Sequence, residues 1–218
     1  MSFPKEFKEA LSHLPASEKD KLILRLLKKD LVLANRLLFE LVNTNTVEEQ
    51  RKKIEERLLY FVRRNSQNGY YTIGYLSYDV RDLSGLINEH VSITKDKFGE
   101  AYLNLVMINE VLKLNRNFIL NSKPPVKRKK FCIAVMARVF KILLIIDKLD
   151  NDYLIEFEEN LKILGNLIID NKFLIEEAIR NGLDVNWLLK PEIPEDIVAI
   201  HKEIRANGFL KYQKIRYL

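Results

Sequence analysis

The side chains best suited to chemistry in this sequence are cations that recur on one side of a helix predicted at residues 126–149. At 100° per residue, Lys127, Lys130, Arg138, Lys141 and Lys148 fall within one narrow stripe of that helix. Cations in such a stripe can bind phosphate groups, and nearby aromatic residues can stack on nucleic-acid bases. The residues that we predict to bind an anionic partner are Lys127, Arg128, Lys130, Arg138, Lys141, Lys211, Lys214 and Arg216.

The last three of these cations belong to a C-terminal tail in which they alternate with Tyr212 and Tyr217. Residues 199–218 contain 5 basic side chains and 1 acidic one, whereas residues 151–198 contain 4 basic and 11 acidic ones. The tail can therefore dock on the acidic region of its own chain or bind an external anionic partner, and the sequence leaves both readings open. Because phosphate binding weakens steeply as salt rises, salt dependence would separate nucleic acid from a protein partner.

Three tyrosines, Tyr71, Tyr75 and Tyr78, lie opposite the apolar sector of a helix predicted at residues 72–91. They either pack against a neighbouring helix or form a contact surface for a partner, because exposed tyrosines supply contact area at low entropic cost. Gly74 and Gly85 lie near the same side, where close approach of another backbone, from this chain or another, would explain a glycine. We predict a partner-binding aromatic face at Tyr71, Tyr75 and Tyr78.

Patterns typical of catalytic and metal sites are missing from the sequence. The histidines, His13, His90 and His201, are far apart and share no metal-binding spacing. The nearest approach to a metal-binding carboxylate cluster is Asp79 with Asp82, or Asp147 with Asp150 and Asp152, and we assign neither group to a metal. There is no Gly-rich phosphate loop and no nucleophile elbow. We therefore predict a non-enzymatic protein with no catalytic residue, metal, cofactor or small-molecule substrate.

Composition indicates an all-α protein. The 218 residues are 47% hydrophobic and include only 7 glycines and 6 prolines. Sheets and barrels need more turn residues, so long helices joined by short loops are favoured. We expect about nine helices around a central apolar helix at residues 126–149, as an irregular array or as HEAT-like stacked pairs in a superhelix. A single domain is predicted over residues 1–218, with residues 122–125 as the boundary if it divides into halves.

The central helix is predicted to be buried in protein. Between residues 131 and 146 only Arg138 and Lys141 are charged. The alternative is a membrane contact, which the Lys-Arg-Lys-Lys run at residues 127–130 would fit, but the apolar stretch is shorter than a typical span and contains two cations. Cys132 is the single cysteine, so no disulfide can form within the chain. The first residues lack the apolar core of a signal peptide, and we predict a cytoplasmic location.

Capping signals predict where several helices begin and end. Residues 17–20 and 46–49 each place an acidic residue three positions after a hydroxyl residue, as in a capping box. Asp30 can cap a separate helix, which we favour over one bent helix, and residues 65–69 predict a break. Gly182 predicts a Schellman-type stop. Residues 178–186 also resemble the end of an ankyrin repeat; because the pattern occurs once and lacks that family's Thr-Pro-Leu-His start, we interpret it as helix capping.

These observations favour a protein whose role is to bind another macromolecule. We predict a protein-binding helical scaffold or adaptor, whose partner is another protein or a second copy of the chain. The alternative is a nucleic-acid-binding protein that uses the basic stripe and the basic, aromatic tail, although a net charge of +6 is modest for that role.

Overall fold

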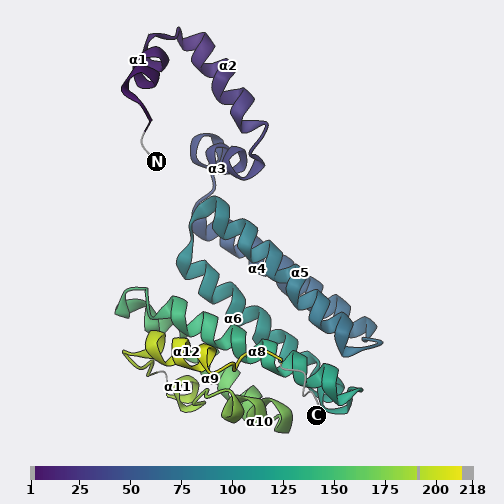
Figure 1. Ribbon diagram of the computed structural model, residues 1–218. Coiled ribbons are helices and arrows are strands. Elements are labelled where there is room, and N and C mark those ends of the chain that lie inside the picture. Colours follow the sequence, from purple (N-terminus) through teal and green to yellow (C-terminus); the bar gives the residue numbers. More distant parts are fainter. Residues whose placement is uncertain (1–2, 191, 213–218) are drawn as a thin grey trace, which may run out of the picture. The chain divides into compact units, whose positions relative to one another are not determined.

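The structure, a computed structural model, describes residues 3–190 and 192–212. In these residues it contains α-helices, one 3₁₀ turn (η1, Asn151–Tyr153) and no strand, which confirms the predicted all-α class (Figure 1). The helices are α1 (Lys5–His13), α2 (Ala16–Leu27), α3 (Leu31–Val42), α4 (Val47–Asn68), α5 (Ile73–Thr94), α6 (Lys97–Leu114), α7 (Arg116–Asn121), α8 (Pro125–Ile146), α9 (Leu154–Ile169), α10 (Lys172–Arg180), α11 (Asn186–Leu189) and α12 (Ile197–Ala206). The sequence predicted fewer helices, about nine, because α7 and α11 are too short to show a helical period.

The chain forms two compact units. One comprises the residues up to Asn45 together with Ser92–Thr94, and the other comprises Thr46–Val91 and the chain from Lys95 onward. Residues 122–125, where the sequence suggested a boundary, lie within the second unit, between α7 and α8. A single domain over residues 1–218 stays a prediction.

In the first unit, α1, α2 and α3 contain no buried residue. The capping box predicted at residues 17–20 is wrong, because α2 begins at Ala16, directly after Pro15, and Ser17 lies inside the helix. Proline has a fixed φ suited to a helix start, so it begins this helix without a side-chain cap. Asp30 does cap a separate helix, since its carboxylate accepts a hydrogen bond from the Leu33 N–H at 3.0 Å.

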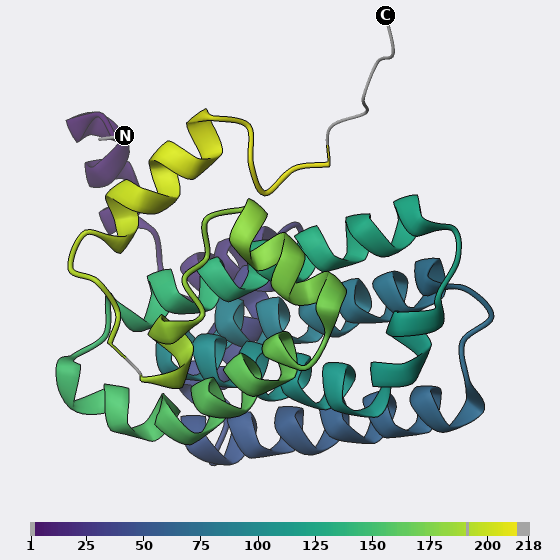
Figure 2. The same cartoon turned by 90° about the horizontal axis from the view of Figure 1, so that it is seen from below.

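The core of the second unit lies around α6 and α8. Helix α6 packs against α4, α8 and α9, and α8 packs in addition against α10 and α12. Within this unit the helices succeed one another from α4 and α5, through α6 and α8, to the group of α9 to α12 (Figures 1 and 2). The predicted central helix is therefore present, and α6, which has buried residues on several of its sides, shares its position.

Helix α8 is buried along most of its length because its apolar residues cover several faces. The buried residues are Phe131, Cys132, Ile133, Val135, Met136, Val139, Phe140, Ile142, Leu143 and Ile146. It begins with Pro125 at its first position, where the missing proline N–H costs no hydrogen bond. Over the part of the chain that the structure describes, no helix has both the length and the apolarity needed to cross a membrane.

Local capping in the second unit follows the sequence closely. Thr46 and Glu49 form the predicted capping box, with each side chain bonded to the other residue's N–H. Helix α4 continues through Asn68, so the break predicted at residues 65–69 is reduced to Gly69, which has φ 72°. The Schellman stop is present: Gly182 has φ 73°, and the Leu183 N–H bonds to the Ala178 carbonyl at 2.9 Å.

Candidate functional site

The three predicted tyrosines point to solvent along the outer side of α5. Tyr71 is 93% exposed, and Tyr75 and Tyr78 are each 59% exposed. The opposite side of the helix is buried, as Ile73 and Leu76 show. In this structure the tyrosines do not pack into the core, which leaves an aromatic surface free for contact.

Five of the exposed residues of α5 form a straight line along the helix, which we call the α5 stripe: Tyr75, Tyr78, Asp82, Gly85 and Glu89. Their spacing alternates between three and four residues, so they stay on one side of the helix over its length. Tyr71 precedes the helix and lies next to the stripe's first residue, with which it borders a cavity of about 370 Å³. The Arg81 guanidinium lies 4.5 Å from the centre of the Tyr78 ring.

A carboxylate beneath the tyrosines holds the ends of α4 and α5 together. Asp79 accepts hydrogen bonds from the Asn65 side chain and the Tyr70 hydroxyl, both at 2.8 Å. Burial first, and the neighbouring Asp79 carboxylate second, raise the pKa of Tyr70 above its ordinary value. Asp79 therefore positions the start of α5. Among the described residues, no group of histidine, cysteine and carboxylate side chains is arranged to hold a metal ion.

The predicted basic stripe on α8 is largely engaged by its own chain. Arg138 is partly buried and donates a hydrogen bond to the Asn104 side-chain carbonyl, and burial lowers the pKa of its guanidinium to about 10. The Lys141 Nζ lies 2.9 Å from a carboxylate oxygen of Glu100. Helical spacing along α8 could not reveal these contacts, because the two partners, Asn104 and Glu100, are on α6.

The start of α8 shows the same pattern. Arg128 donates a hydrogen bond to the Ser122 carbonyl at 2.8 Å, and its guanidinium lies 3.5 Å from the centre of the Phe173 ring. Lys127 and Lys130 remain exposed. The predicted anion-binding residues on α8 therefore form no continuous row of free cations.

The described part of the C-terminal tail docks on its own chain. The Leu210 side chain is buried, and its N–H donates to the Asn181 side chain at 2.8 Å. Lys130 lies 4.6 Å from the centre of the Tyr212 ring. Lys211 is exposed. The other predicted tail residues, Lys214, Arg216 and Tyr217, lie outside the described residues.

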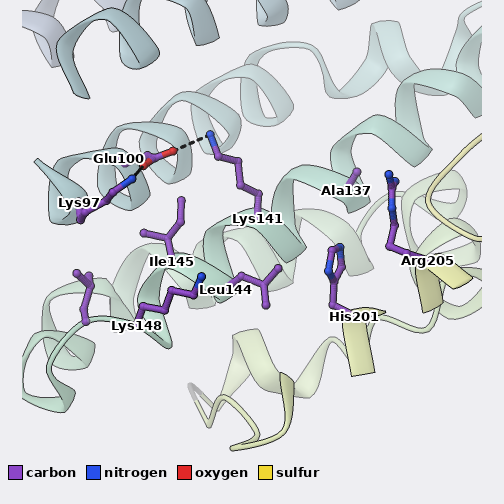
Figure 3. Close-up of a pocket in the computed structure, with 10 residues that line it drawn as sticks. Lys97, Glu100, Ala137, Lys141, Leu144, Ile145, Lys148, His201 and Arg205 are labelled. Atoms are coloured by element: carbon purple, nitrogen blue, oxygen red, sulfur yellow. Dashed lines mark hydrogen bonds and ion pairs between the residues drawn. The ribbon is translucent and has the colours of Figure 1, made fainter. Parts of the chain in front are cut away.

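A second candidate site is a cavity of about 490 Å³ between α6, α8 and α12 (Figure 3). Its lining consists of Lys97, Glu100, Ala137, Lys141, Leu144, Ile145, Lys148, Leu149, His201 and Arg205. Sequence reasoning placed Lys141 and Lys148 in the basic stripe but missed Lys97, His201 and Arg205, because no local signal links α6 and α12 to α8.

The one carboxylate of this cavity is held between two lysines. Lys97 and Lys141 lie 2.8 Å and 2.9 Å from the Glu100 oxygens, and Figure 3 shows both converging on it. Burial would raise the pKa of Glu100, but the two lysines outweigh it and the pKa is lowered. On the α12 side, burial and then the Arg205 charge lower the pKa of His201. Glu100 is therefore ionised and His201 neutral at pH 7.

Comparison of the chain with protein-family models, with curated proteins and with solved structures finds no significant match. Two surfaces of the second unit are left as candidate binding sites: the exposed side of α5 and the cavity between α6, α8 and α12.

Proposed function

We propose that this chain is a non-enzymatic protein-binding module whose contact surface is the outer side of α5. The observation that carries the proposal is the joint exposure of Tyr71, just before α5, and of Tyr75 and Tyr78 on a helix whose other side is buried. Tyrosine is enriched at the energetically dominant positions of protein interfaces, because it combines a large apolar ring with a polar tip. A cytoplasmic location remains our prediction from the sequence.

Gly85 supports a helix as the segment that binds there. A Cβ atom placed on Gly85 would meet no described atom within 4 Å outside its own helix. Glycine within a helix costs about 1 kcal/mol relative to alanine, and here no close contact within the described chain explains it. A partner backbone that approaches α5 closely at this point would explain it.

The spacing of the α5 stripe fits the same kind of partner. Two helices that pack along their length contact each other through residues spaced alternately three and four apart, as Tyr75, Tyr78, Asp82 and Gly85 are. Asp82 is exposed and makes no ion pair with a described residue. The partner helix is therefore expected to place a lysine or arginine opposite Asp82.

The alternative function is nucleic-acid binding through the remaining exposed cations, Lys127, Lys130 and Lys211. It has less support, because Arg128, Arg138 and Lys141 are occupied by contacts within the chain. Binding of single-stranded oligonucleotides that weakens steeply with salt and is insensitive to changes in the α5 stripe would favour it over our proposal.

The proposal is tested by photo-crosslinking in cells that express the chain. Benzoylphenylalanine replaces Tyr78 in one variant and Tyr153, an exposed tyrosine away from α5, in the control. We expect a discrete crosslinked protein at position 78 and none of the same mass at position 153. A crosslink to a second copy of the chain would identify self-association as the form of binding.

A second substitution shows whether the crosslink reports close helix contact. Gly85→Leu leaves the buried side of α5 intact but projects a bulky side chain from the stripe, so it should abolish the position-78 crosslink. A melting temperature at or above that of the wild type would show that folding is preserved. Equal crosslinking with Gly85 and with leucine would overturn the proposed helix contact.

A further inference from the structure

The cavity between α6, α8 and α12 has the size and lining of a small-molecule site. Its volume of about 490 Å³ falls within the range of roughly 300–1,000 Å³ typical of ligand pockets. Ala137, Leu144, Ile145 and Leu149 supply an apolar floor from α8 and the residues that follow it. A floor of this kind favours a ligand with an apolar group.

Charge is distributed unequally around that floor. The four cations Lys97, Lys141, Lys148 and Arg205 face one carboxylate, Glu100, so the lining carries a net charge of +3 with His201 neutral. Glu100 already lies between Lys97 and Lys141. The excess positive charge is therefore centred on Lys148 and Arg205.

Within residues 3–190 and 192–212, no carboxylate neutralises these two cations. In the described chain neither Lys148 nor Arg205 forms an ion pair, and Arg205 instead donates a long hydrogen bond, 3.3 Å, to the Leu210 carbonyl. Figure 3 shows Lys148 beside Leu144, just after the end of α8, and Arg205 on α12 at the other end of the cavity, beyond His201. An anionic group bound here would gain charge-assisted hydrogen bonds.

We propose that this cavity binds a small ligand in which an anionic group, a phosphate monoester or a carboxylate, is joined to an apolar group. The apolar group lies on Leu144 and Ile145, and the anionic group contacts Lys148 next to Leu144 or Arg205 at the other end of the floor. The lining holds no nucleophile activated by a neighbouring base, so the site binds and does not transform its ligand. This site is independent of the α5 stripe, and neither proposal requires the other.

The test is calorimetric titration of the full chain with three probes that share one ring system. 1-Naphthyl phosphate and 1-naphthoate carry the two candidate anionic groups, and 1-naphthol carries none. We expect at least one anionic probe to bind about tenfold or more tightly than 1-naphthol. The stronger of the two anionic probes identifies the preferred group. Equal affinity for 1-naphthol, or no binding of either anion up to millimolar concentration, would overturn the proposal.

Two variants locate the binding. The first is a double variant, Lys148→Ala with Arg205→Ala, which removes two exposed cations from the cavity. The control is the double variant Lys52→Ala with Lys113→Ala, which removes two exposed cations away from the cavity. We expect about a tenfold or greater loss of affinity only in the first pair. Equal losses in both pairs would show that net charge alone attracts the probe, which also contradicts the proposed site.

A cavity-filling variant tests the apolar part without changing charge. Ala137→Phe places a ring over the floor, so it should abolish binding of the anionic probe while Lys148 and Arg205 remain. Circular dichroism and the unfolding midpoint show whether each variant keeps its fold. Retained binding in a folded Ala137→Phe variant would place the probe outside the cavity.

Discussion

The role of Arg138 follows from its neighbours in the structure and not from its position along α8. Its guanidinium bonds to the Asn104 side-chain carbonyl, and the Asn104 amide in turn donates to the Glu100 backbone carbonyl at 2.7 Å. Asn104 is buried. The arginine therefore satisfies a buried polar group that would otherwise lack a donor, which is a role in stability.

Replacing Arg138 by alanine should lower the free energy of unfolding by about 1–3 kcal/mol, because the Asn104 oxygen loses its hydrogen-bond donor. Urea unfolding measures the change. Lys141→Ala is the matched control: Glu100 keeps Lys97, and the loss should stay below about 1 kcal/mol. A smaller loss for Arg138→Ala than for the control would contradict this role.

Asp96 is the centre of a second polar group. It caps α6 by accepting a hydrogen bond from the Gly99 N–H, and it also receives two hydrogen bonds from Arg51, at 2.7 Å and 2.9 Å. His90 lies 3.1 Å from the same carboxylate. Helical spacing within α4 does not reveal this contact, because Arg51 reaches Asp96 at the start of α6.

The Asp96 group predicts a specific acid sensitivity. Burial alone would raise the pKa of Asp96, but hydrogen bonds from His90, Arg51 and Gly99 outweigh it and lower the pKa from 3.8 to about 2. Because the folded-state pKa is depressed, the stabilisation is complete above pH 3.8 and is lost as pH falls toward about 2. This one group should account for about 2 kcal/mol over that interval.

Urea unfolding at a series of pH values measures this contribution. Asp96→Asn should be less stable at neutral pH and should lose less stability than the wild type between pH 4 and pH 2. Parallel curves for the two proteins would show that Asp96 does not titrate in this interval.

At the scale of elements, α8 is the helix whose burial the sequence indicates most clearly. Phe140, at its centre, is fully buried, and its ring lies against Trp187 and His201. Phe140→Ala should lower the free energy of unfolding by about 3–5 kcal/mol, because it leaves a cavity in the core. Chemical denaturation measures the loss, and Phe209→Ala, at a 42% exposed ring, should cost far less. A cost below about 1 kcal/mol for Phe140→Ala would mean that α8 is not central.

Helix α5 makes a prediction of the opposite sign. Gly85→Ala should raise the free energy of unfolding by about 0.5–1 kcal/mol, because alanine favours the helix and open space surrounds the added methyl group. Thermal melting of the purified chain measures this gain. If the same variant weakens the position-78 crosslink, then alanine at position 85 favours folding, whereas glycine favours binding of the partner. A drop in stability would show that the space around Gly85 is filled.

At the scale of the whole molecule, the two units differ in how they are held together. The helices of the first unit contain no buried residue, whereas α6 and α8 in the second unit contain many. Segments with few buried contacts open with a lower free energy than a packed core. Limited trypsin digestion should therefore cut α1 to α3 first and leave a long-lived fragment that contains α4 to α12. Mass spectrometry of a time course identifies the cuts, and first cleavage within α6 or α8 would contradict this order.

The sequence by itself determined the all-helical class, the burial of α8 and most helix ends, because these depend on composition, on helical periodicity and on contacts within a few residues. Thr46, Asp30 and Gly182 follow from such local rules, whereas Ser17 fails because a neighbouring proline begins the helix earlier.

Only the tertiary structure decided which polar residues are free. Along α8, three cations look equivalent to the exposed Lys127: Arg128, Arg138 and Lys141. The partners of Arg138 and Lys141 are on α6, whereas Arg128 contacts α10 and the end of α7. The cavity that gathers Lys97, Lys148 and Arg205 likewise joins elements far apart in the chain. Contacts of that range leave no periodic or local trace in a sequence, because they are set by how whole helices pack.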